Sequence, residues 1–350
     1  MGTVVALLVL SILIFFHELG HFIAARYFGV RVEVFSIGFG KKIYTKKIGD
    51  TLWSISAIPL GGYVKMKGQD DTDPSKISYD KDSYTSKKPW QRIIILLAGP
   101  FANFLIAFIL YLAIAMIGVP KLLPYVGKVG ENTPAFQAQL NKGDKLLQIN
   151  GKPIHYWEEI GEHINNTNGT ISVLIERQNK PISLQLTPKV INDTNMFGEK
   201  VTRRIIGITA SGKQEMVHFG FTNTFSYAWD ETKRASSLIA TSIKKLVTGD
   251  ISSDKLGGVI TIVDVTAKAS NAGIIALFFF TALISVNLGV LNLLPIPALD
   301  GGHIMFNLYE MLTGKTASEK VMLYLTMFGW MLLISLMLLG LYNDITRLWG

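Results

Sequence analysis

The sequence predicts a multi-pass α-helical membrane protein with four transmembrane helices, a membrane-associated β-hairpin region and an inserted α+β domain. Hydrophobic residues make up 49% of the 350 residues, and many of them gather in four long stretches. A region of alternating apolar and polar residues follows the first stretch, which is typical of strands. A polar segment with short β-like runs lies between the second and third stretches and predicts a soluble insert.

Each of the four apolar stretches is long enough to cross a bilayer, which takes about 20 residues in a helix. The stretches cover residues 3–28, 93–119, 272–294 and 321–341. The first lacks the basic leader and small-residue cleavage site of a secretory signal, so we expect it to be retained as a span. The lipid bilayer is therefore the first predicted partner.

Lysine and arginine residues set the predicted orientation. They gather between spans one and two and between spans three and four, which places both segments in the cytoplasm. Residues 121–271 and both termini then lie on the opposite, periplasmic or extracellular, side. Lipid headgroups and orientation explain the net charge of +8, and no nucleic-acid-binding motif accompanies it, so we expect no nucleic-acid partner.

Local patterns refine this organisation. Residues 31–66 alternate in polarity and contain Gly38 and Gly40, which predicts strands and hairpins at the inner membrane surface, and the polar run 68–88 predicts a flexible loop. Apolar residues at helical spacing predict a helix over 221–247, which either lies on the membrane or packs on the soluble domain; the two alternatives are equally supported. The predicted regions are 1–120 with spans one and two and the β region, 121–190 as the soluble domain, 191–270 as linker and amphipathic helix, and 271–350 with spans three and four.

The motif HELGH at residues 17–21 is the strongest chemical signal. His17 and His21 are four residues apart, so on a helix both imidazoles share one face and can hold one zinc ion, Zn²⁺. Glu18 stands beside the first ligand and can accept a proton as general base. The alternative is a pair of hydrogen bonds between helices, but three ionisable side chains within a span are costly and favour a functional site. Thiolate ligands are excluded because the chain has no cysteine.

A hydrolytic zinc site needs a third protein ligand, and Asp300 is the candidate. Spans two to four contain no Asp, Glu, Lys, Arg or His, and Asp300 directly follows span three in the run NLLPIPALDGGH. Pro295 and Pro297 interrupt the helix there, and irregular backbone at membrane depth is tolerated where it lines a buried cavity. Asp300 can instead merely cap the next helix. His303 is a rival ligand, although one turn further on it suits a hydrogen-bonding partner of the ligands better.

Three asparagines in the spans offer polar amides. Asn292, near the proline break, is expected to bind the substrate backbone or a developing oxyanion. For Asn287 this function and a hydrogen bond between helices are equally supported. Asn103, in AGPFAN, stands among small residues and is expected to contribute to helix packing.

These motifs together, HELGH, GFG, PLGGYVKM, AGPFANF and NLLPIPALDGGH in this order, resemble the site-2 protease family over nearly the whole chain. The nearest branch is the bacterial regulator-of-sigma-E protease group. The resemblance implies that His17, His21 and Asp300 bind zinc and that Glu18 is the catalytic base. It also implies a substrate-handling role for the residues Asn287, Asn292, Pro295, Pro297, Gly38 and Gly40.

The soluble insert is similar to protease-associated PDZ domains through TPAFQAQLNKGDKLLQINGKPIHYWEEI. Such domains bind extended peptides at a sheet edge. This chain has one such unit where many relatives have two. The family implies an intramembrane zinc metalloprotease of the bacterial inner membrane, with its active site toward the cytoplasm. Its expected partners are single-pass transmembrane substrates, either anti-sigma factors or remnant signal peptides.

Two other functions are compatible with parts of the sequence. A zinc transporter would also place His and Asp in spans, but it needs several sites along a path and no Glu beside a His. A catalytically inactive scaffold would act through the PDZ-like domain alone. Both alternatives predict that replacing Glu18 by glutamine leaves function intact.

Overall fold

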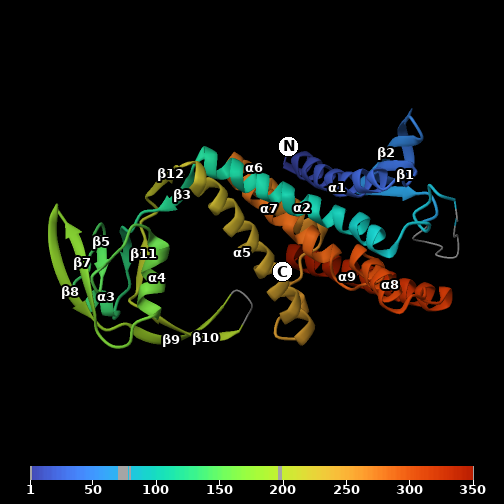
Figure 1. Cartoon of the computed structure of the whole chain (residues 1–350). Helices are drawn as coiled ribbons and strands as arrows, with labels where there is room; N and C mark the ends of the chain where they lie inside the picture. The colour runs from blue at the N-terminus through green and yellow to red at the C-terminus, as the bar shows by residue number, and fades with distance from the viewer. Residues whose placement is uncertain (1, 70–77, 79, 196–198, 350) are drawn as a thin grey trace. The chain divides into compact units, whose positions relative to one another are not determined.

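A computed structural model describes residues 2–69, 78, 80–195 and 199–349 of the chain. These residues form two compact units, of which the first comprises 1–114, 221–244 and 253–350 and the second 115–220 and 245–252. The first unit holds four helices long and apolar enough to span a membrane: α1 (Gly2–Tyr27), α2 (Pro89–Ile117), α7 (Ile274–Asn292) and α9 (Glu319–Trp349). The predicted multi-pass fold with four transmembrane helices is thereby confirmed (Figure 1).

Small residues allow these helices to approach one another closely. A Cβ atom added to Gly20 of α1 would lie 2.2 Å from the Ala98 carbonyl oxygen of α2, and one added to Gly289 of α7 would lie 3.3 Å from that of Pro100. Large apolar side chains point outward instead: only 11% of the most apolar window of α9 is buried. Lipid can take the place of protein on that face, so the helices need close backbone contact rather than a broad apolar core.

Strands β1 (Val32–Ile48) and β2 (Thr51–Met66) form one long antiparallel hairpin that folds over on itself. Val34 pairs with Leu52 on one side and with Lys65 on the other, so the first half of β1 lies between the two halves of β2. Gly38 and Gly40 have φ values of 88° and 83°, in the region that favours glycine, and lie where the register shifts. The segment 63–66 is thereby placed at one edge of this small sheet.

The hairpin is fixed to α1 by aromatic packing. Phe35 is fully buried, stacks on Trp53 with ring centroids 4.4 Å apart, and meets Phe15 and Phe22 of α1 edge to face. Such pairs add about 0.5–1.5 kcal/mol each beyond the area that they bury. The predicted strands between the first two spans therefore belong to the membrane unit.

The second unit is an α+β domain built on a four-stranded sheet of order β6-β5-β7-β8; because it contains the insert that was predicted to be PDZ-like, we call it the PDZ-like unit. Alternate strand residues point into its core: Ile171, Val173 and Ile175 of β7 are fully buried while Ser172 and Leu174 between them are only partly so. The larger elements are β5 (Lys145–Ile149), β6 (Lys152–Pro153), α4 (Trp157–Asn165), β7 (Ile171–Arg177), β8 (Lys180–Leu186), β9 (Lys189–Thr194) and β10 (Lys200–Ile205). The short ones are β3 (Val119–Leu122), β4 (Val126–Val129), α3 (Pro134–Gln137), β11 (Ile208–Ala210) and β12 (Gln214–Val217).

Three further helices complete the first unit: α5 (Phe221–Thr248, its last turn in the second unit), α6 (Val259–Ala272) and α8 (Asp300–Thr313). Helix α6 packs against α1, α7 and α9. In α5 the buried stripe consists of small and hydroxyl residues, Ala228 and Thr232 among them, whereas Phe221 and Trp229 are 80% and 65% exposed. Phe221 and Trp229, two of the large apolar residues that predicted this helix, therefore do not face the protein.

Candidate metal centre

Helix α1 presents its two histidines to the interior of the membrane unit. His17 and His21 lie one helical turn apart, and their Nε2 atoms are 3.2 Å from each other. Both residues are buried, with 9% and 6% of their surfaces exposed. The i, i+4 spacing predicted from the sequence thus directs both imidazoles to the same point.

Asp300 reaches the same point from the first residue of α8. Its Oδ2 atom lies 3.3 Å from His17 Nε2 and 3.4 Å from His21 Nε2. The N-cap position of α8 belongs to Leu299, so the Asp300 carboxylate is turned toward the histidines rather than serving as the cap. One carboxylate oxygen, carried by a helix far along the chain from α1, therefore completes a group of three donor atoms.

The three donor atoms fit a zinc ion. Tetrahedral coordination with bonds of about 2.0–2.1 Å requires donor atoms about 3.3 Å apart, and the three separations are 3.2, 3.3 and 3.4 Å. Asp300 Oδ2 is buried and makes no well-formed hydrogen bond, which is costly for a carboxylate unless a cation binds it. Two imidazole nitrogens and one carboxylate oxygen leave a fourth position open, as catalytic zinc sites do.

The turn before α8 explains how Asp300 reaches this depth. Helix α7 ends at Asn292, and the chain crosses Pro295 and Pro297 before α8 begins. A Cβ atom at Gly301 would lie 2.2 Å from the Leu294 carbonyl oxygen, and one at Gly302 would lie 2.4 Å from that of Ile296. Only glycine fits at both positions, so the DGG run lets the helix start directly against the backbone of the turn.

Helix α2 contacts the Nδ1 atoms of the two imidazoles. His21 Nδ1 lies 2.8 Å from the Ile95 carbonyl oxygen, and His17 Nδ1 lies 3.1 Å from the side-chain amide of Asn103. A Cβ atom at Gly99, between these two residues, would lie 2.2 Å from His21 Nε2. Asn103 was expected from the sequence to serve packing only, and its contact with His17 was missed. The four-residue spacing of positions 95, 99 and 103 along one face of α2 was the available signal.

A cavity of about 180 Å³ opens beside the three donors. Glu18, Asn292 and His303 line it together with the candidate ligands. The remaining lining residues are Gly62, Tyr63, Val64, Met66, Gln69, Leu96, Ala298 and Leu299. The other predicted site residues are not among the residues that line this cavity in the described part of the chain: Asn287, Pro295, Pro297, Gly38 and Gly40.

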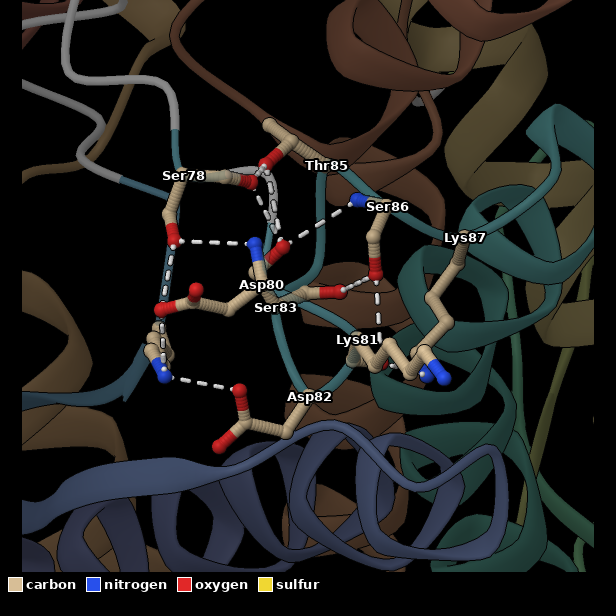
Figure 2. A network of polar contacts seen from close by, with 9 residues as sticks. Ser78, Asp80, Lys81, Asp82, Ser83, Thr85, Ser86 and Lys87 are labelled. Atoms are coloured by element: carbon tan, nitrogen blue, oxygen red, sulfur yellow. Dashed lines mark hydrogen bonds and ion pairs between the residues drawn. The ribbon is translucent and has the colours of Figure 1, made fainter.

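Ion pairs fix the segment that follows β2, close to this cavity. The Lys67 ammonium pairs with the carboxylates of Asp80 at 2.8 Å and Asp82 at 2.7 Å (Figure 2). These hydrogen bonds raise the pKa of Lys67 and lower the pKa of both aspartates. Residues 70–77 and 79 of the predicted loop lie outside the described residues. Residues 80–88 contain no helix or strand but make defined hydrogen bonds.

Comparisons with known proteins find relatives among zinc metalloproteases. The profile of peptidase family M50 matches residues 5–336. A relative from Campylobacter jejuni that carries the name of a zinc metalloprotease is 46% identical, over 98% of this chain and 93% of its own length. The regulator of sigma-W protease RasP of Bacillus subtilis is 29% identical over 99% of both chains.

Among solved structures, the PDZ domain of an SdrC-like protein from Listeria monocytogenes is 23% identical and covers 25% of this chain and 84% of its own, with a TM-score of 0.20. The match to the family profile spans most of the chain, and the relatives named above are matched over nearly their whole length. The predicted resemblance is confirmed, as is zinc as the cofactor of the family. The chain therefore belongs to peptidase family M50, the site-2 protease family of zinc metalloproteases.

Proposed function

We propose that this protein is an intramembrane endopeptidase that cleaves the transmembrane segments of single-pass membrane proteins. In this proposal His17, His21 and Asp300 hold the zinc ion and Glu18 is the general base. One observation supports it above the others: three donors at tetrahedral spacing and a carboxylate line one cavity, and two of the donors belong to a membrane-spanning helix. The site accordingly acts on a peptide bond that is itself within or next to the bilayer.

Glu18 and Asn292 divide the chemistry between them. A bound zinc ion supplies Lewis acidity, which polarises the scissile carbonyl and acidifies water. Glu18 takes a proton from the attacking water as its oxygen adds to the carbonyl carbon, and then delivers that proton to the amide nitrogen as the C–N bond breaks. The Asn292 amide donates a hydrogen bond to the oxygen on which negative charge develops. A helix hides its peptide bonds, so the substrate must first become extended.

The sheet edge formed by residues 63–66 is suited to hold that extended substrate. Tyr63, Val64 and Met66 line the cavity, and the segment 63–66 pairs with β1 along one side only within the described part of the sheet. A Cβ atom at Gly62 would lie 3.2 Å from Glu18 Cγ, so this strand runs directly past the proposed base. An extended peptide added to the free edge would gain backbone hydrogen bonds and lie beside Glu18. Gly38 and Gly40 then act indirectly, by allowing the fold of the hairpin.

The names of relatives support a class of physiological substrate rather than a particular protein. RasP of Bacillus subtilis is named a regulator of sigma-W, and anti-sigma factors or remnant signal peptides are therefore the proposed substrates here. The bacterial relatives favour a position in the inner membrane. The cationic segments between spans favour an orientation with the metal centre toward the cytoplasm and the PDZ-like domain on the other side. Asn287, Pro295 and Pro297 remain proposed substrate-handling residues. Their contribution would come through the turn that carries Asp300.

Cleavage of a purified model substrate tests the proposal. The full-length protein is incubated in detergent with a single-pass substrate, and the wild type is compared with Glu18→Gln, which keeps the shape of the side chain and removes the base. We expect a fall in the cleavage rate of about 100-fold or more, as general bases contribute about 10²–10⁴. The matched control is Glu131→Gln, at an exposed site of the other unit, which should cleave like the wild type.

Chelation provides the second arm of the same experiment. Removal of zinc should stop cleavage, and added zinc should restore it. Cleavage that persists in Glu18→Gln or in chelator would contradict the proposal. Zinc uptake into proteoliposomes that survives Glu18→Gln would instead support a transporter, and normal biological activity of that variant would support a scaffold.

A further inference from the structure

Helix α2 meets both histidines of α1, and its residues Ile95 and Asn103 contact the Nδ1 atoms rather than the Nε2 atoms at the metal position. The contacts come from Ile95, Gly99 and Asn103, which are four residues apart and so follow one face of α2. The Asn103 side chain is fully buried, and its backbone carbonyl accepts a hydrogen bond of 2.7 Å from the Ser285 hydroxyl of α7. Asn103 is thus fixed between three helices.

The two histidines differ in how clearly their tautomers are set. The Ile95 carbonyl can only accept, so it requires a proton on His21 Nδ1 and leaves His21 Nε2 with a free lone pair for the metal. Asn103 offers an amide with both a donor and an acceptor. His17 can bind a metal through Nε2 only if this amide presents its oxygen, because Nδ1 must then carry the proton.

We propose that Asn103 is a positioning residue that holds His17 in the zinc-binding tautomer, with Asn103 Oδ1 accepting from His17 Nδ1–H. This inference rests on the metal site proposed above. Nδ2 is the amide atom placed 3.1 Å from His17 Nδ1, and Oδ1 is buried without a hydrogen-bond partner. The two ends of a carboxamide have nearly the same shape, so half a turn about χ2 places Oδ1 beside His17 Nδ1 without a steric change and moves Nδ2 to the position that Oδ1 leaves.

The arrangement gives each imidazole an acceptor behind it and the metal in front. Acceptors of this kind fix the orientation of a ligating histidine and raise its basicity, and their loss typically weakens metal binding by about 10–100-fold. The acceptor for His21 is the backbone carbonyl oxygen of residue 95, so a side-chain substitution there does not remove it unless the geometry of the helix changes. The acceptor for His17 depends on one side chain, which makes it open to test.

Zinc affinity of the full-length protein in detergent, measured by competition with a chromogenic zinc chelator, tests the inference without a substrate. Asn103→Leu removes the acceptor, and Asn103→Ala does so with no added bulk; both should weaken zinc binding by about 10–100-fold. Asn103→Asp keeps an acceptor and should retain most of the affinity. The matched control is Ser285→Ala, which removes a hydrogen bond to the same residue but leaves its amide in place, and should bind zinc like the wild type.

Three results would overturn the inference. Wild-type affinity in Asn103→Ala would show that the amide is not needed, and equal losses in Asn103→Asp and Asn103→Ala would show that the amide donates rather than accepts. In wild-type protein with ¹⁵N-labelled histidine, a His17 proton on Nε2 rather than Nδ1 would contradict the inference without any substitution. His17→Ala separates the two proposals: zinc binding unchanged in that variant would contradict the metal site itself.

Discussion

The two units of this protein solve the problem of burial in opposite ways. In the PDZ-like unit the interior is aliphatic, with Leu146, Ile171 and Ile175 fully buried in one cluster. In the membrane unit many large apolar side chains face outward, and buried polar residues such as Asn103, Ser285 and Asn307 lie inside. Water drives the first arrangement, whereas lipid removes the penalty for exposing apolar surface in the second.

This difference changes what a buried residue means. In the PDZ-like unit a buried side chain contributes chiefly to stability, and polar groups there serve local structure, as when the Asp144 carboxylate accepts two hydrogen bonds from Arg177. In the membrane unit a buried polar group is costly to insert and therefore indicates either a contact between helices or a functional site. Glycines such as Gly20 and Gly99 allow the close contacts between membrane helices.

The largest expected difference between the two units concerns the replacement of a glycine by alanine. Gly99→Ala places a Cβ atom 2.2 Å from His21 Nε2, so the imidazole must move. Displacement of a catalytic group by about 1 Å can cost about 100-fold in rate, and we expect a loss of at least that size in cleavage together with weaker zinc binding.

Gly161→Ala is the matched substitution in the other unit. No heavy atom lies within 4 Å of the new Cβ, and the residue is in the middle of α4. Alanine there should stabilise the PDZ-like unit by about 0.5–1 kcal/mol and leave zinc binding unchanged. Cleavage by Gly99→Ala at the wild-type rate would show that Gly99 is not needed to place His21, and the expected difference between the two glycines would be wrong.

The next effect concerns apolar residues. Ile175→Ala empties a fully buried position of β7 and should cost the PDZ-like unit about 2–5 kcal/mol. Leu338→Ala removes a side chain that is 57% exposed on α9 and should change stability by about 0.5 kcal/mol or less. Hydrogen exchange of each unit in the full-length protein measures both effects. Equal losses would show that the outward face of α9 is packed against protein after all.

The elements that follow from chain length and periodicity were predictable. Four spans could be read from the sequence because a bilayer fixes the length of an apolar helix, and each predicted span overlaps one of the four observed spanning helices. The HELGH spacing placed His17 and His21 on one face, and Asp300 was the remaining carboxylate at suitable depth. That these three bind zinc stays a prediction from geometry, as do the roles of Glu18 and Asn292.

What escaped prediction depends on how helices and strands face one another. Alternation in residues 31–66 indicated hairpins, but the placement of Val34 between two halves of β2 requires register shifts that alternation does not encode. Periodicity predicted α5 without revealing that Ala228 and Thr232 form its buried side, because an apolar face can meet lipid or protein. Asn103 touches His17 across 86 positions of sequence, and the rotation of α2 that brings them together is not visible in a motif of small residues.

The smallest effect is a pH dependence confined to the polar segment after β2. Lys67 lowers the pKa of Asp80 and Asp82 through hydrogen bonds, so both carboxylates stabilise the folded segment above their ordinary pKa of 3.8. This stabilisation is lost as the pH falls below 3.8 and through the lowered values, because protonated carboxyls no longer pair with the ammonium. The pKa of Lys67 is raised in turn, so its own contribution persists through neutral pH and is lost only above the ordinary value of 10.5.

The backbone amide of Tyr84 reports on this segment, since it donates to the Lys67 carbonyl. Its hydrogen exchange, corrected for the intrinsic pH dependence, should become faster as the pH is lowered from about 5 to about 3 in the wild type and change little in Lys67→Met. Asp80 is exposed to solvent and Lys67 and Asp82 are partly exposed, so salt screens these ion pairs and the effect should shrink further at high salt. The amides of Ile171 and Val173 in the PDZ-like unit, which are buried at the end of β7 opposite Arg177 and its ion pair with Asp144, should show no matching change. A parallel acceleration in β7 would mean that acid loosens the whole chain, and the local role of Lys67 would then be wrong.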